Sequence, residues 1–272
     1  MENQQKLMCM FALIAEKLIS ISAIQLERTR KKDNMSVLFQ TKHLTKRYKE
    51  HEAVSNISIS VSRGQIYGLI GKNGAGKTTL LKLVSGLIKP TSGNVEFGIE
   101  DSSNDECRIG ALIEAPGFYP NMSGYENLKA QSLCLGLNYS RQQIEELLDL
   151  VGLLYAKSKK AKAYSLGMKQ RLGIALSLIG NPDLLVLDEP INGLDPEGII
   201  EIRNIVTKLN TERNMTIIIS SHILDELAKI ATNFCIIHSG KVVLEKSKEE
   251  FLKDCGDLPI DEYYLKIIGG IK

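Results

Sequence analysis

From residue 37 onward, the alternation of apolar and polar residues divides the chain into short strands and amphipathic helices. Residues 37–42 and 57–61 alternate apolar with polar side chains, which is typical of antiparallel strands that bury one face. Four later segments are almost continuously apolar, as strands are in a parallel sheet covered on both faces. They are residues 66–70, 184–187, 216–219 and 234–237. The pattern predicts an α/β fold with a largely parallel sheet flanked by helices.

The pattern changes between residue 116 and about residue 165, where helices are predicted without a strong strand between them. Residues 124–135 and 141–151 carry apolar side chains at helical spacing. We interpret residues 116–172 as a helical subdomain inserted into the α/β core. The chain then returns to strands, and a hairpin over residues 234–245 is predicted to close the core.

The ends of the chain lie outside this pattern, and we assign residues 35–250 to the main domain. Residues 1–34 contain an apolar stretch that Glu16 and Lys17 interrupt, so it falls short of a convincing membrane span. An amphipathic helix on a membrane or partner surface is one interpretation of this stretch. We favour a poorly anchored extension, and a translation start at Met35 would remove it. Residues 251–272 are predicted to form a short C-terminal tail.

Composition and charge narrow the classes of protein that the sequence fits. The net charge is +2, from 34 basic and 32 acidic residues, so no broad positive field favours nucleic acid and no such partner is expected. The five cysteines are widely spaced without a metal-ligand pattern, so we expect free thiols in a reducing compartment. They are Cys9, Cys107, Cys134, Cys235 and Cys255.

A glycine-rich turn follows the apolar strand at residues 66–70 and precedes an amphipathic helix. It fits the phosphate-loop pattern G-x-x-x-x-G-K-[ST], in which glycines let backbone N–H groups surround phosphates at a helix N-terminus. Lys77 is placed to reach the β- and γ-phosphates, and the hydroxyl of Thr78 to coordinate Mg²⁺. The sequence therefore predicts a nucleoside triphosphate site. Its loop residues are Gly71, Lys72, Asn73, Gly74, Ala75, Gly76, Lys77, Thr78 and Thr79.

A second apolar strand, at residues 184–187, ends in two carboxylates. Acidic residues at the carboxyl end of a strand face the ligand crevice of an α/β sheet. Asp188 suits Mg²⁺, through a bridging water, and Glu189 suits a general base that orients the attacking water. An apolar strand followed by Asp-Glu is common by itself. The pair indicates a nucleotide-hydrolysing site because the same chain also contains the phosphate loop.

Five motifs in order resemble those of the nucleotide-binding subunits of ABC transporters. They are the phosphate loop, SLGMKQR at 165–171, LLVLDEP at 184–190, NGLDP at 192–196 and the lone His222. The resemblance covers residues 36–250. It implies a P-loop NTPase core with an antiparallel β subdomain and an inserted α-helical signature subdomain. The resemblance also implies that the protein binds ATP with Mg²⁺.

The resemblance also implies a composite site in a head-to-tail dimer. Ser165 and Gly167 match the signature residues that bind the γ-phosphate from across the dimer, and Ser165 is also suited to cap a helix. Leu166 replaces a glycine of the family's signature. Asp195 matches the loop that couples the two sites. The second subunit is expected to be another copy of this chain or a related ATPase subunit.

The resemblance assigns roles to three further residues. His222 matches the switch histidine that contacts the γ-phosphate, and Tyr48 lies where an aromatic ring stacks on adenine. Glu114 replaces the glutamine that ligates Mg²⁺ in most of the family, and a carboxylate can serve as such a ligand too. This glutamate, with the following residues 116–128, is similar to the subgroup that exports bacitracin and lantibiotics.

The resemblance implies an ATPase that drives export of membrane-active peptides through separate polytopic permease subunits, at the cytoplasmic face of the membrane. A different transported substrate and a soluble ABC ATPase scaffold remain as alternatives. A guanine-nucleotide switch is not favoured, because the sequence has no Asn-Lys-x-Asp motif. A structural domain with a degenerate loop is not favoured, because the phosphate-loop lysine and threonine and both strand-end carboxylates are intact.

Overall fold

The computed structural model describes residues 36–98 and 107–269. From Val37 onward the chain forms one compact unit. The predictions for residues 1–34, which include Cys9, lie outside the described residues, and the domain boundaries remain predictions. No helix in the described part of the chain is both long and apolar enough to cross a membrane.

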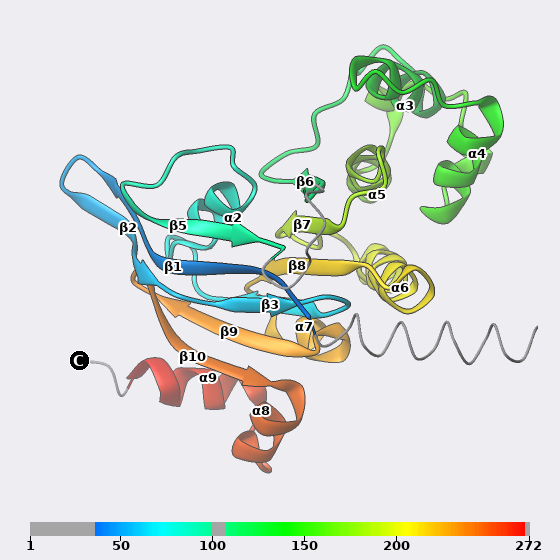
Figure 1. The fold of residues 1–272 in the computed structure, drawn as a ribbon. Coiled ribbons are helices and arrows are strands. Elements are labelled where there is room, and N and C mark those ends of the chain that lie inside the picture. The colour runs from blue at the N-terminus through cyan, green and yellow to red at the C-terminus, as the bar shows by residue number, and fades with distance from the viewer. Residues whose placement is uncertain (1–35, 99–106, 270–272) are drawn as a thin grey trace, which may run out of the picture. The chain divides into compact units, whose positions relative to one another are not determined.

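The central sheet has six strands in the order β10-β9-β4-β8-β7-β6 (Figure 1). Its neighbours run parallel except for β10, which is antiparallel to β9. The strands are β4 (Ile66–Ile70), β6 (Ile109–Leu112), β7 (Leu184–Asp188), β8 (Thr216–Ser221), β9 (Asn233–His238) and β10 (Lys241–Ser247). The predicted parallel sheet and hairpin are confirmed, and the carboxyl ends of β4, β7 and β8 meet at one edge.

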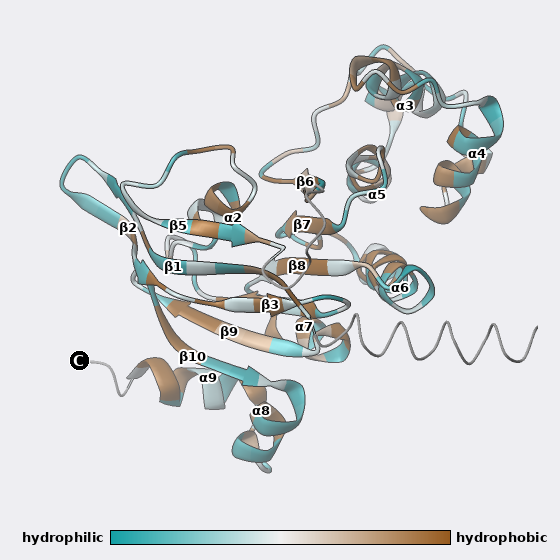
Figure 2. Cartoon of the chain, viewed as in Figure 1, coloured by the Kyte–Doolittle hydropathy of each residue, from teal (hydrophilic) through white to brown (hydrophobic). Residues whose placement is uncertain are grey.

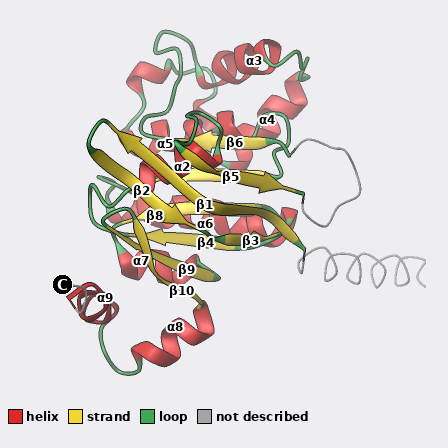
Figure 3. Ribbon diagram, turned by 60° about the vertical axis from the view of Figure 1, so that its left-hand side comes forward, coloured by secondary structure: helices red, strands yellow, loops and turns green. Residues whose placement is uncertain are grey.

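A second sheet is antiparallel and has four strands, with β1 paired to each of the others (Figure 3). They are β1 (Val37–Tyr48), β2 (His51–Ile57), β3 (Ser60–Ser62) and β5 (Ser92–Phe97). The prediction of one strand over residues 57–61 is wrong, because residues 58 and 59 belong to no strand and separate β2 from β3. The Thr41 hydroxyl donates to the carbonyl of Ile57 and accepts from the N–H of Ile59, both at 3.0 Å, and so stabilises the break.

Helices cover the sheet and build the predicted helical subdomain. Serines begin two of them, because Ser123 and Ser140 each form a capping box with the side chain three residues on. The subdomain contains α3 (Gly124–Cys134), α4 (Arg141–Leu150), the 3₁₀ turns Leu154–Ala156 and Ala161–Ala163, and α5 (Leu166–Ser177). The other helices are α2 (Lys77–Val84), α6 (Pro196–Arg213), α7 (Leu224–Ile230), α8 (Lys248–Cys255) and α9 (Ile260–Gly269). Helix α9 lies within the residues predicted as a tail, whereas α8 begins at Lys248, in the part predicted to belong to the main domain.

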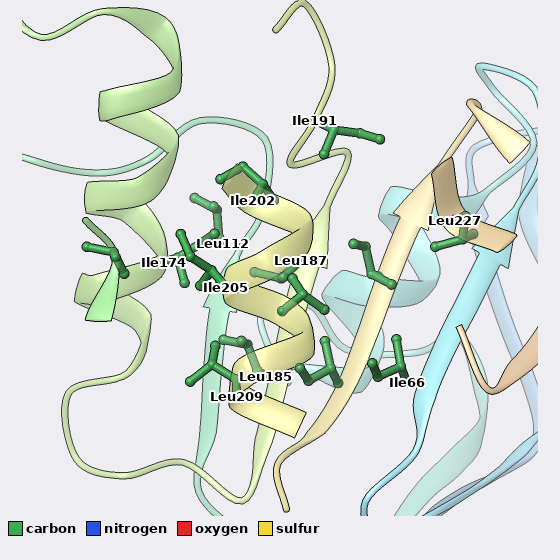
Figure 4. Close-up of a cluster of buried hydrophobic side chains, with 14 of the residues drawn as sticks. Ile66, Leu112, Ile174, Leu185, Leu187, Ile191, Ile202, Ile205, Leu209 and Leu227 are labelled. Carbon is green, nitrogen blue, oxygen red and sulfur yellow. The ribbon is translucent and has the colours of Figure 1, made fainter. Parts of the chain in front are cut away.

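Alternate residues of the central strands face two hydrophobic clusters. Leu185 and Leu187 of β7 lie in the cluster that also contains α5 and α6 side chains (Figure 4). Leu184 and Val186 lie in the other cluster, with α2 and the antiparallel sheet. Each such fully buried aliphatic side chain contributes about 1.5–3 kcal/mol. Burial on both faces explains the nearly continuous apolar strands, which Figure 2 shows in brown.

Candidate functional site

The phosphate loop lies between β4 and α2, against backbone from two other elements. A Cβ atom at Gly71 would lie 2.6 Å from a carbonyl oxygen of β9, and one at Gly76 would lie 2.4 Å from the carbonyl oxygen of Ala53 in β2. The N–H of Gly240, in the β9–β10 turn, donates to the carbonyl of Ala75 at 2.9 Å. The two glycines permit this close approach because they lack a side chain.

Two glycines of the loop give a matched test of this packing. Gly76 has φ +108° and faces the Ala53 carbonyl, whereas Gly74 has φ +81° and open space around its Cα. We expect Gly74→Ala to lower the free energy of unfolding by about 1 kcal/mol, because it strains the backbone alone. Gly76→Ala should lower it by about 2 kcal/mol or more, since the neighbouring backbone must also move. Urea unfolding of both variants measures the difference, and equal losses would contradict the packing argument.

Lys77 begins α2 and buries its amine at the centre of the site, with a side chain that is 5% exposed. Nζ donates to the carbonyl of Gly71 at 2.6 Å and forms an ion pair with Oε1 of Glu189 at 3.0 Å. Oε1 has no partner with full hydrogen-bond geometry in the described part of the chain, so this contact is electrostatic. A buried ammonium group needs a compensating anion, and Glu189 supplies it.

Glu189 stands just past the end of β7 and joins the lysine to the end of β8. Its backbone has φ +50°, a left-handed conformation that costs a residue with a side chain about 1–3 kcal/mol. Oε2 lies 2.7 Å from Nδ1 of His222, and the backbone N–H donates to Oγ of Ser220 at 2.8 Å. The structure therefore links the predicted base, switch histidine and phosphate-loop lysine into one chain of charged and polar groups.

Asp188 is buried between two hydroxyl groups. Thr78 Oγ1 donates to Oδ2 and Ser220 Oγ donates to Oδ1, both at 2.7 Å. The carboxylate and the threonine hydroxyl are hard oxygen ligands, so this pair fits the preference of Mg²⁺. Ser220 was not predicted from the sequence, although it is a polar residue at the end of an apolar strand next to β7, which is a signal for a ligand-facing position.

Lys77, Thr78 and Glu189 lie on a cleft of about 350 Å³, whereas Asp188 and His222 are not among the residues that line it. The lining residues are Tyr48, His51, Ala53, Lys72, Asn73, Gly74, Gly76, Lys77, Thr78, Thr79 and Glu189. His51 and Ala53 were not predicted, and they reach the cleft because β2 pairs with β1 and places His51 opposite Tyr48. Tyr48 is 46% exposed, so its ring is accessible at the cleft. The remaining loop residues, Gly71 and Ala75, are buried.

The predicted signature residues, and Asp195 of the predicted coupling loop, lie at helix N-termini and do not line this cleft. Ser165 caps α5 by accepting from the N–H of Met168 at 3.2 Å, and Asp195 caps α6 by accepting from the N–H of Gly198 at 2.9 Å. Ser165 and Asp195 are both exposed. Leu166, which is 49% exposed, packs against the loop before α6, since a Cβ at Gly193 would lie 3.5 Å from its Cδ2.

A Cβ at Gly167 would likewise lie 3.8 Å from Cδ2 of Leu194, in the loop that precedes α6. Gly167 is therefore part of the same contact between the start of α5 and the 192–195 loop. The predicted signature motif and the predicted coupling loop therefore lie side by side and form one continuous surface.

Glu114 lies just after β6 and forms an ion pair with a lysine of α2. Its Oε1 accepts from Nζ of Lys82 at 2.5 Å, and this hydrogen bond raises the pKa of Lys82. The Glu114 side chain is 65% exposed and its backbone has φ +64°. The predicted metal ligand Glu114 thus pairs with Lys82, which lies five residues after Lys77 in α2.

Comparison with known proteins identifies the family. Residues 54–192 match the family model described as ABC transporter. The chain is 47% identical over 215 residues to the bacitracin transport ATP-binding protein BcrA of Bacillus licheniformis, covering 78% of this chain and 70% of that protein. It is 46% identical over 210 residues to the lantibiotic transport ATP-binding protein SrtF of Streptococcus pyogenes, covering 77% of this chain and 90% of that protein.

The fold agrees with a crystal structure of the ADP conformation of MJ1267, an ATP-binding cassette of an ABC transporter. The two share a TM-score of 0.71 and 26% identity, over 85% of this chain and 99% of that one. The chain belongs to the ABC transporter family and is an ABC ATPase, an enzyme that binds and hydrolyses ATP. Among similar solved structures, the ATP-binding cassette MJ0796 is dimeric in a post-hydrolysis state bound to ADP and Pi, and cbiO1 of Clostridium perfringens is part of the ABC transporter complex cbiONQ.

Proposed function

We propose that this ATPase energises the export of membrane-active peptide antibiotics of the bacitracin and lantibiotic type, through separate polytopic permease subunits at the cytoplasmic face of the membrane. The observation that carries the proposal is the similarity to both BcrA and SrtF over more than three quarters of the chain. The biological role would be protection of the cell against peptides that act on its membrane.

In this proposal the cleft holds the triphosphate through its loop N–H groups and Lys77, with the adenine on Tyr48. Thr78 and Asp188 hold Mg²⁺, which neutralises phosphate charge when bound. Glu189 orients the attacking water and accepts its proton, and His222 contacts the γ-phosphate from the end of β8. The contacts that support these roles are those of Glu189 with both Lys77 and His222.

The proposal includes a two-fold dimer in which each cleft is completed by the other subunit. Ser165, Gly167 and Asp195 would approach the γ-phosphate of the partner's nucleotide. Their place supports this role, because the start of α5 and the start of α6 lie side by side while Ser165 and Asp195 are exposed outside the subunit's own cleft. An N-terminus of a helix is a favourable anion site. The helical subdomain and the Glu114 loop would receive the permease.

Glu114 gives a prediction that separates ATP binding from coupling. We expect Glu114→Gln to change the Kd for ATP by less than about fivefold, because an exposed ion pair such as that with Lys82 contributes only about 0–1 kcal/mol. The same variant should change the level of peptide resistance in cells, since the loop that it alters is proposed to contact the permease. Glu212→Gln, on the exposed side of α6, is the control. Unchanged resistance in Glu114→Gln cells would reject the coupling role.

The test of the function is deletion of the gene in its native host, followed by complementation with wild type or Glu189→Gln. Sensitivity is measured to lantibiotics, bacitracin and unrelated drugs. Selective sensitivity to the peptides, rescued by the wild type alone, is the expected result. No change across the panel would reject the peptide substrate. Copurification with a polytopic membrane protein separates transport from the alternative of a soluble scaffold, which has no such partner.

A further inference from the structure

The short helix α7 begins two residues after the predicted switch histidine, so its position affects where that histidine lies. His222 stands between Ser221, the last residue of β8, and Ile223, the N-cap of α7. Ile223 is apolar and cannot cap the helix with its side chain, and its N–H instead donates to Oγ of Ser221 at 2.9 Å. A displacement of α7 would therefore move His222 relative to the end of the sheet.

An ion pair joins the first turn of α7 to α6. Nη1 of Arg203 in α6 donates to Oε2 of Glu226 at 3.0 Å, and the two side chains are only 25% and 20% exposed. Glu226 lies four residues after the histidine, in the first turn of α7. Its other carboxylate oxygen pairs with Lys229 of the same helix. Arg203 thus supplies a charged contact from outside α7, whereas Lys229 supplies one within it.

The Arg203–Glu226 pair lies beside a small cavity between α6, α7 and β8. The cavity has a volume of about 10 Å³, and most of the side chains that line it are isoleucine or leucine. A low dielectric beside the pair strengthens its attraction. Ile191 and Ser221 also line the cavity. Because Ile191 follows Glu189 by two residues and Ser221 precedes the histidine, the pair adjoins both segments that carry the proposed catalytic groups.

The contact that depends on this arrangement is the one between Glu189 and His222. Oε2 of Glu189 lies 2.7 Å from Nδ1 of His222 and accepts from its backbone N–H at 3.3 Å. On the side of the sheet, α7 is held by packing, because a Cβ at Gly68 of β4 would lie 2.9 Å from Cδ2 of Leu227. On the side of α6, the charged contact comes from Arg203.

We propose that Arg203 is a positioning residue for ATP hydrolysis: through its ion pair with Glu226 it holds the start of α7 and thereby keeps His222 in contact with Glu189. The inference rests on the proposed roles of Glu189 and His222. It assigns a role to residues that lie beyond residues 54–192, which the family model matches.

The first test compares Arg203→Met with Arg203→Lys, which keeps the charge, and with Lys208→Met, which removes an exposed lysine of the same helix. We expect kcat per bound ATP to fall about three- to tenfold in Arg203→Met while the KM stays within about twofold, because the phosphate loop is unchanged. The fall should stay below the 10²-fold or so that a misplacement of about 1 Å can cost, since Leu227 still packs on β4. Arg203→Lys and the control should keep kcat within about twofold, because a point charge can replace the single Nη1 contact.

A second test repeats Arg203→Met in a His222→Ala background. There the substitution should change kcat less than about twofold, because the contact that it maintains is already lost. Equal falls in the two backgrounds would overturn the proposal, since they would indicate a general packing role. A fall in Arg203→Lys as large as that in Arg203→Met would also overturn it, because the charge would then not be what holds α7.

Amide hydrogen exchange of the nucleotide-free protein tests the anchoring without ATP. The peptide over residues 219–229 should exchange faster in Arg203→Met than in the wild type or in Lys208→Met. Unchanged kcat and exchange in Arg203→Met would reject the proposal. Wild-type turnover in His222→Ala would instead reject the proposed role of His222, while the exchange comparison would still test whether Arg203 holds α7.

Discussion

Glu189→Gln should abolish ATP turnover while the protein still binds ATP. Loss of a positioned general base lowers a rate by about 10²–10⁴-fold, because the amide cannot accept the proton of the attacking water. ATP affinity should be equal to that of the wild type or higher, since the carboxylate that pairs with Lys77 at 3.0 Å no longer competes with phosphate for the amine. The variant should accumulate as an ATP-bound dimer.

Phosphate release measures the turnover, and size-exclusion chromatography with ATP measures the dimer. Glu212→Gln is the control, because it removes a carboxylate from an exposed position of α6 and should behave as the wild type. A Glu189→Gln protein that hydrolyses ATP at more than about a tenth of the wild-type rate would refute the assignment of Glu189 as the base.

Lys77→Met is expected to have the second largest effect, on both binding and turnover. A charged hydrogen bond contributes about 1.5–3 kcal/mol, so removal of the amine should weaken ATP binding about 10- to 100-fold. Turnover should fall by at least a further 10²-fold or so, because the same charge stabilises the transferred phosphoryl group. Isothermal titration with ATP and phosphate release at saturating ATP separate the two effects.

The stability of Lys77→Met without nucleotide must also be measured, because the Lys77 side chain is only 5% exposed and its charge neutralises that of Glu189. The matched control is Lys89→Met, which removes an exposed lysine just beyond the same helix. We expect that control to retain wild-type affinity. If Lys77→Met bound ATP as tightly as Lys89→Met does, the phosphate loop would not be the triphosphate site.

The sequence predicted those parts of the fold that depend on local pattern. Buried strands such as β4 and β7 have apolar runs because both of their faces are covered, and the phosphate loop is defined by residue types within nine positions. The carboxyl end of β7 was also predictable, because Asp188 and Glu189 end an apolar run at the edge where ligands bind.

The sequence did not predict contacts between distant segments. Ser220 bonds Asp188 from 32 residues away, and Lys82 pairs with Glu114 across the same number of positions. Neither pair has a periodic signal, because its partners come together only when the sheet order brings their elements side by side. Helices α8 and α9 were not predicted for the same reason. Their aromatic side chains pack through contacts such as Phe251 with Phe234 of β9, which the sequence pattern does not show.

If ATP binds as proposed, the ion pair between Lys77 and Glu189 means that binding exchanges one anion for another at the lysine. In the free protein the buried ammonium group already has a counter-ion, so the triphosphate gains only the difference between two interactions. The displaced carboxylate becomes available to water at the same moment. In the proposed site Glu189 is therefore the counter-ion of Lys77 while the phosphate is absent, and the arrival of the substrate would itself release the proposed base.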